Sequence, residues 1–115
     1  MMRKKEYFND RFIVGGSKGK YIFFTKDMNH PHPGVFLFAD DFEDYSPHIV
    51  YLENSESVSE SVKNILKNPL VNDCLINCFL GVSVIQNPNA REEIVYDIIA
   101  SLGYMPECNK LISYF

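Results

Sequence analysis

No stretch of this sequence is apolar over the roughly 20 residues that a membrane-spanning helix needs, so we expect no transmembrane segment. Glycine and proline, with six residues each, are too scarce for a fibrous or linker protein. No apolar segment follows the basic start of the chain, so we expect no secretory signal peptide. The sequence is 46% apolar and 23% charged, which predicts a single globular domain over residues 1–115, located in the cytoplasm.

Lysine and arginine are absent from residues 27–60, which carry eight acidic residues and a formal charge of −8. Residues 1–26 have a charge of +5 and residues 61–115 a charge of −1. Nucleic-acid-binding proteins usually gather a large basic face that displaces counterions. A modest basic excess next to an acidic block argues against a nucleic-acid partner. Solvated faces of one molecule, or an electrostatic docking surface for another protein, explain the pattern better.

The cysteines number three, and an odd count in a chain expected to be intracellular argues against a disulfide framework. Cys74 and Cys78 are four residues apart and share one face of a helix, while Cys108 stands alone. A structural zinc site needs four ligands, which these residues do not supply. We therefore predict that they are small core residues. No local motif supports a cysteine nucleophile with His48 as its base.

The first half of the chain has the short aromatic and β-branched runs that are typical of strands. They lie at residues 12–14, 21–25, 35–39 and 48–52. The glycine-rich loop Gly15–Lys20 predicts a hairpin, and its spacing and the strand after it do not match a phosphate-binding loop. Because the connections are too short to hold a crossover helix, we expect an antiparallel meander of three or four strands within residues 7–53.

The second half of the chain has helical spacing. Ser57 and Glu60 have the spacing of a capping box, which predicts a helix that begins there and stops by Asn68. The apolar stripe of this helix consists of Val58, Val62, Ile65 and Leu66.

Two Asn-Pro pairs, at residues 68–69 and 87–88, predict the starts of two further helices, because asparagine caps a helix whose first residue is proline. The second helix is expected to end near Gly81 and the third at Gly103. The segment Val82–Ile85 reads either as helix or as a short strand. The side chains expected to be buried are Leu70, Val71, Cys74, Leu75, Cys78 and Phe79 in the second helix and Ile94, Val95, Ile98, Ile99 and Leu102 in the third.

Two of the predicted strands, Tyr21–Phe24 and Val35–Phe38, are apolar on both faces instead of alternating. Either the helices and the N-terminal segment cover both faces, or one aromatic face is open to a partner. The second alternative makes Phe36 and Phe38 candidate contact residues, for another protein or for a second copy of the chain.

The acidic loop after the third predicted strand is the other candidate docking surface, through Asp40, Asp41, Glu43 and Asp44. These acids, together with His30 and His32, also contain the ligand types of a metal site and the carboxylate pairs of acid–base catalysis. The histidines precede the third strand and the acids follow it, so we expect the two groups at opposite ends. We therefore assign no metal site, with His30 and His32 as the weak candidates for one.

These patterns predict an α+β fold, in which the antiparallel meander is followed by three helices and a short C-terminal helical turn after Pro106. We expect no cofactor. The favoured function is a non-catalytic protein-interaction module, such as an inhibitor or immunity-like adaptor, with an unidentified protein partner or a homodimer partner. The alternative is a small metal-dependent or acid–base hydrolase that uses His30, His32 and the acids of residues 40–44. Whether the protein is an enzyme is left open, and the non-catalytic interpretation is favoured.

Overall fold

The computed structural model describes residues 11–25, 31–43 and 46–112, with their side chains except at positions 41–43 and 46. Its strands form one antiparallel sheet in the order β1-β2-β5-β3-β4. The strands are β1 (Arg11–Gly15), β2 (Lys20–Thr25), β3 (Gly34–Glu43), β4 (Ser46–Ser55) and β5 (Phe79–Val84). The predicted α+β class and antiparallel sheet are confirmed, whereas the predicted count of three or four strands is wrong, because five are present.

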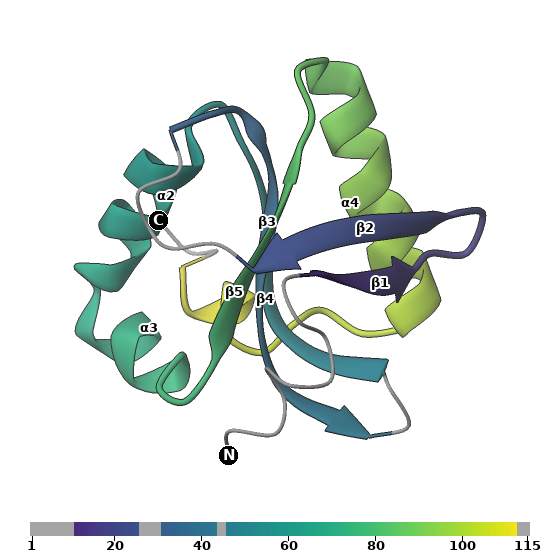
Figure 1. Cartoon of the computed structure of the whole chain (residues 1–115). Coiled ribbons are helices and arrows are strands. Elements are labelled where there is room, and N and C mark those ends of the chain that lie inside the picture. Colours follow the sequence, from purple (N-terminus) through teal and green to yellow (C-terminus); the bar gives the residue numbers. More distant parts are fainter. Residues whose placement is uncertain (1–10, 26–30, 44–45, 113–115) are drawn as a thin grey trace.

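Helices lie on both sides of this sheet (Figure 1). They are α2 (Val58–Leu66), α3 (Pro69–Cys74) and α4 (Pro88–Leu102), followed by the short 3-10 turn η1 (Asn109–Leu111). Helices α2 and α3 pack on one face and α4 packs on the other, so alternate residues of β3 enter two separate core clusters. This two-sided packing explains why the β3 sequence is apolar on both faces. None of the described helices is both long and apolar enough to cross a membrane.

The predicted meander is wrong, because β5 lies between β2 and β3 in the sheet. The hairpins β1–β2 and β3–β4 are present, but β3 pairs with β5 over six positions and not with β2. A pairing between residues so far apart in the sequence leaves no local signal. Gly81 makes this arrangement possible, since a Cβ atom there would lie 2.6 Å from the ring of Phe12 on β1.

The second helix is shorter than predicted. It ends at Cys74 rather than near Gly81, and Asn77, with a φ of 70°, lies in the turn that precedes β5. Leu70, which was predicted to be buried, is 63% exposed. The ambiguous segment from Val82 onward is strand as far as Val84.

The predicted starts of the three helices are confirmed, but the predicted side-chain cap is absent in the first of them. Asn68 and Asn87 accept hydrogen bonds from backbone amides of α3 and α4, as their Asn-Pro pairs predict, and Gly103 ends α4 with a φ of 76°. Ser57 occupies the cap position of α2 but makes no side-chain cap hydrogen bond. The first amide of α2 instead donates to the backbone oxygen of His32, 3.1 Å away.

A disulfide joins Cys74, at the end of α3, to Cys108, just before η1. The prediction that the cysteines form no disulfide is therefore wrong for these two residues, whereas the prediction of core residues is confirmed for Cys108, and Cys74 and Cys78 pack partly buried against the same core. The partners are 34 residues apart in the sequence and their Cα atoms lie 5.9 Å apart, a proximity that only the folded chain creates. Disulfides persist where thiols are kept oxidised, and the cytoplasm usually keeps thiols reduced. The expected cytoplasmic location is not tested by the structure and stays a prediction.

Candidate functional site

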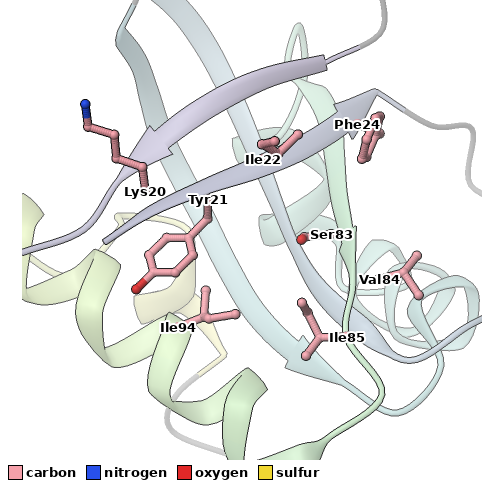
Figure 2. A pocket seen from close by; sticks show the side chains of 8 residues that line it. All are labelled: Lys20, Tyr21, Ile22, Phe24, Ser83, Val84, Ile85 and Ile94. Carbon is pink, nitrogen blue, oxygen red and sulfur yellow. The ribbon is translucent and has the colours of Figure 1, made fainter. Parts of the chain in front are cut away.

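The sheet is open between β2 and β5. These strands pair at only two positions, Phe24 with Val82 and Thr25 with Gly81, so the first four residues of β2, Lys20–Phe23, have no strand partner on the β5 side. Figure 2 shows β2 and β5 diverging around this opening. Its volume is about 500 Å³, and it is lined by Lys20, Tyr21, Ile22, Phe24, Ser83, Val84, Ile85 and Ile94.

Large apolar side chains are exposed beside the opening. Ile13 of β1 and Ile22 of β2 are cross-strand partners with exposed fractions of 58% and 47%, and Val84 of β5 is 44% exposed. Strand alternation places all three on the sheet face that α2 and α3 cover over β3 and β5. Those helices do not bury them. Within the described residues, this part of the sheet is therefore an apolar surface that no helix covers.

Basic residues border this apolar surface at both ends. Arg11 precedes Ile13 by two residues and Lys20 precedes Ile22 by two, so strand alternation gives each base the same face as its isoleucine. Both bases are exposed. We call this surface the hairpin face and define it as Arg11, Ile13, Lys20, Ile22, Phe24 and Val84.

Asp97 of α4 holds the turn of the β1–β2 hairpin. Its carboxylate accepts hydrogen bonds from the Ser17 hydroxyl at 2.8 Å, from the backbone amides of Lys18 and Gly19 at 2.9 and 3.0 Å, and from the Tyr21 hydroxyl. The glycine-rich loop thus directs its amides at a carboxylate of its own chain, which supports the prediction of a hairpin turn. The turn that leads into β2 at Lys20 is therefore attached to α4.

Electrostatics at this attachment favour the ionised carboxylate. The hydrogen bond from Tyr21 is the largest cause that lowers the pKa of Asp97, to about 2, and the bonds from Ser17 and the two amides add to it against the opposing effect of burial. The same bond raises the pKa of the Tyr21 hydroxyl. Gly16 is required here, since a Cβ atom at this position would lie 2.2 Å from the Asp97 carboxylate.

The described part of the predicted acidic surface is Asp40. Its carboxylate lies 2.8 Å from Nδ1 of His48, whose Nε2 lies 3.5 Å from Glu107. Both ring nitrogens of this histidine therefore face carboxylates. Burial, followed by the charges of Glu107 and Asp40, raises the pKa of the nearby Tyr104 hydroxyl. The side chains of Asp41 and Glu43, and the whole of residue Asp44, lie outside the described residues.

The structure does not bring the predicted histidines and acids together, as far as their residues are described. His32 is exposed just before β3, and Asp40 lies towards the other end of that strand. Residue His30 lies outside the described part of the chain. Over residues 11–25, 31–43 and 46–112, no three histidine, cysteine, aspartate or glutamate side chains are grouped as metal ligands would be.

The candidate aromatic contacts are core residues. Phe36 is fully buried and Phe38 nearly so, in the cluster that includes Val58 and Val62 of α2. The structure therefore does not present them at the surface. The sequence left open whether both faces are covered or one is open to a partner, and for β3 helices cover both faces.

The sequence analysis missed the exposed isoleucines and the role of Asp97. A signal for Asp97 was present, since this lone acid lies between apolar residues that were predicted to face the core, Ile94, Val95 and Ile98. The exposure of Ile13 and Ile22 had no local signal, because it depends on where α2 and α3 end over the sheet. Comparison of the chain with protein-family models, curated proteins and solved structures finds no match.

Proposed function

We propose that this protein is a non-catalytic protein-interaction module that binds its partner at the hairpin face. The observation that carries the proposal is the exposure of the cross-strand pair Ile13 and Ile22, at 58% and 47%, next to an apolar opening in the sheet. Contiguous apolar surface with a polar rim marks interaction sites in proteins, whereas single exposed apolar residues need no explanation. A module of this kind acts by occupying a surface of its partner, as an inhibitor or immunity-like adaptor does.

The partner that fits is a protein segment in extended conformation, with alternating apolar side chains and acidic residues at its ends. Alternate apolar side chains match Ile13, Ile22 and Val84, which share one face of the sheet. Acidic ends match the exposed Arg11 and Lys20. The edge of β2 without a strand partner offers backbone hydrogen bonds of the kind used when a peptide adds a strand to a sheet.

The alternative of a hydrolase has less support from the geometry. His32 and Asp40 are eight residues apart along an extended segment, which corresponds to roughly 25 Å at 3.3 Å per residue. Side chains at that separation do not act on one substrate bond. The His48 ring is held between two carboxylates, with Asp40 at Nδ1 and Glu107 at Nε2.

A peptide-binding measurement tests the proposal. The probe is a fluorescein-labelled peptide with valine and isoleucine at alternate positions and acidic residues at both ends, and binding is followed by fluorescence anisotropy. We expect a dissociation constant of roughly 10 µM, weakened at least about tenfold by Ile22→Asp. The matched control is Ile76→Asp, because Ile76 is 66% exposed but lies after α3, and this variant should bind as the wild type does.

Two further experiments distinguish an acidic peptide from other partners that could bind the hairpin face. A peptide with lysine in place of the acidic residues should bind more weakly, and equal binding of both peptides would overturn the proposed acidic partner. Sedimentation equilibrium tests the homodimer. A wild-type dimer that Ile22→Asp converts into a folded monomer would identify a second copy of the chain as the occupant and overturn the peptide assignment.

The acidic segment of residues 40–44 is tested with the same protein preparation. A variant with Asp40, Asp41, Glu43 and Asp44 replaced by Asn or Gln should keep its peptide binding. Loss of binding in this variant, with binding retained in Ile22→Asp, would move the docking surface to the acidic end of the β3–β4 hairpin.

A further inference from the structure

A second cavity lies at the opposite edge of the sheet from the hairpin face, between β4, α2 and the C-terminal segment. Its volume is about 450 Å³. One wall is apolar, and the other carries hydroxyl, amide and carboxylate groups. The lining residues are Tyr51, Glu53, Ser61, Asn64, Ile65, Met105, Asn109 and Ile112.

The carboxylate of Glu53 is the acceptor on which the polar wall converges. It accepts hydrogen bonds from the Tyr51 hydroxyl and from Ser61 of α2. The Ser55 and Ser61 hydroxyls are hydrogen-bonded at 2.7 Å, and donation by Ser55 leaves the Ser61 proton for the carboxylate. The amide of Ser57 in turn donates to the Ser55 hydroxyl at 3.0 Å. With that orientation, the series of hydrogen bonds from the Ser57 amide through Ser55 and Ser61 leads to Glu53.

This carboxylate lacks a basic partner within the described part of the chain, where none of the ion pairs involves Glu53. Burial raises the pKa of Glu53, and the hydrogen bonds from Tyr51 and Ser61 act in the opposite direction. A carboxylate offers about four lone-pair positions, of which the two hydrogen bonds occupy only half. A partly buried charge without an opposite charge is unfavourable, so a cation in the cavity would be bound favourably.

The other polar side chains of the cavity differ in their availability. Asn109 is already bonded to β4, since its amide group accepts from the backbone nitrogen of Leu52 and donates to the backbone oxygen of the same residue, both at 2.9 Å. Asn64 is exposed on α2. Ile65, Met105 and Ile112 provide a surface for a short carbon chain.

We propose that this cavity is a binding site for a small organic amine, whose ammonium group donates hydrogen bonds to Glu53 while its carbon chain packs against Ile65, Met105 and Ile112. Asn64 lies at the same cavity and adds an amide oxygen as a further acceptor for the ammonium group. The site is independent of the hairpin face, because it shares no lining residue with the opening between β2 and β5.

The test is a titration of the full chain with butylammonium, followed by ¹H–¹⁵N correlation spectra. We expect a dissociation constant of about 1 mM, with the largest shifts in β4, α2 and η1. Butyrate, an anion of similar length, should produce no saturable shifts at these positions. Glu53→Gln should weaken butylammonium binding at least about tenfold, whereas the control Glu60→Gln, at an exposed position of α2, should leave it unchanged.

A second variant keeps the test decisive if Glu53→Gln is poorly folded. Asn64→Lys brings an ammonium group of the chain itself to the cavity, so it should abolish butylammonium binding and raise the melting temperature. Equal binding of butylammonium and butyrate, or undiminished binding in Asn64→Lys, would overturn the proposal. Because Ile22→Asp should leave this titration unaltered, failure of the amine site and failure of the hairpin face are distinguishable.

Discussion

The two sides of the sheet are held together by different chemistry. On one side, α4 adds to its apolar contacts two buried ionisable residues, Arg91 and Asp97, which bond to groups far away in the sequence. On the other side, α2 and α3 are held by apolar packing and by the disulfide Cys74–Cys108. The comparison shows that both sides use apolar packing, and that buried charged side chains add directional bonds on the α4 side alone.

Arg91 attaches the first turns of α4 to two other segments. Its side chain is 3% exposed and donates to the Asn54 side chain at 2.8 Å and to the backbone oxygens of Ile85 and Gln86, both at 3.0 Å. The end of β4 and the connection from β5 to α4 are therefore joined by one guanidinium group. A planar group with five donors suits this geometry, and lysine would not reproduce it.

On the side of α2 and α3, most of the contacts are made by apolar side chains, which form no directional bonds. Val58, Val62 and Ile65 of α2 enter the core cluster with Phe36. The disulfide then ties the end of α3 to the C-terminal segment, whose Asn109 bonds to the backbone of β4. Apolar packing thus supplies the burial, and the disulfide and one amide set the position of the C-terminal segment.

Loss of the disulfide should have the largest effect of the stability variants. The chain-entropy relation for a loop closed across 34 residues predicts a decrease of about 4 kcal/mol in the free energy of unfolding for Cys74→Ala with Cys108→Ala. Urea unfolding measures this, and hydrogen exchange should speed up in α3 and η1 before α4. Cys78→Ala is the control and should cost about 1 kcal/mol or less. A similar loss in both variants would mean that the bond does not stabilise this side.

Replacement of Arg91 should have the next largest effect. Arg91→Met leaves Asn54 and two carbonyl groups without their donor, so we expect a loss of about 3 kcal/mol, again measured by urea unfolding. Glu56, whose side chain is 89% exposed, lies 3.5 Å from the same guanidinium group. Glu56→Gln should therefore cost less than about 0.5 kcal/mol. Equal costs would show that the polar attachment of α4 is not structural.

The smallest effect is expected at Asp97, and it should depend on pH. Because the folded-state pKa is about 2, below the ordinary value of 3.8, the ionised carboxylate stabilises the fold above pH 3.8 and loses this effect as the pH falls towards 2. Asp97→Asn should thus be less stable than the wild type at neutral pH, and the difference should shrink between pH 4 and pH 2. Urea midpoints measured across this range test it. The control Glu92→Gln, at an exposed position of α4, should show no such convergence.

Local sequence signals correctly predicted several features that depend only on neighbouring residues. The first two hairpin strands, the Asn-Pro helix starts and the glycine that ends α4 all depend on residues within a few positions of each other. The meander was wrong because residues 79–84 enter the sheet between strands much earlier in the chain. Their apolar residues have the composition of a helix face as well as of a buried strand, and periodicity alone does not separate the two.

The candidate site shows the same division. The sequence showed the apolar character of β1 and β2 and the basic residues beside them. It did not show which isoleucines stay exposed, since their burial depends on how far α2 and α3 extend over the sheet. Phe36 and Phe38 have equally apolar neighbours in the sequence and are buried. Glu53 was counted only as one of the acidic residues, because its donors and its cavity come from α2 and the C-terminal segment.

The sequence by itself determined the α+β class, the two hairpins and the starts of the helices, because each depends on contacts between near neighbours. Only the tertiary structure decided the place of β5, the pairing of Cys74 with Cys108 and the docking of Asp97 on the hairpin turn. It also decided which apolar side chains remain at the surface. These features join residues tens of positions apart, and such contacts form only when the whole chain packs.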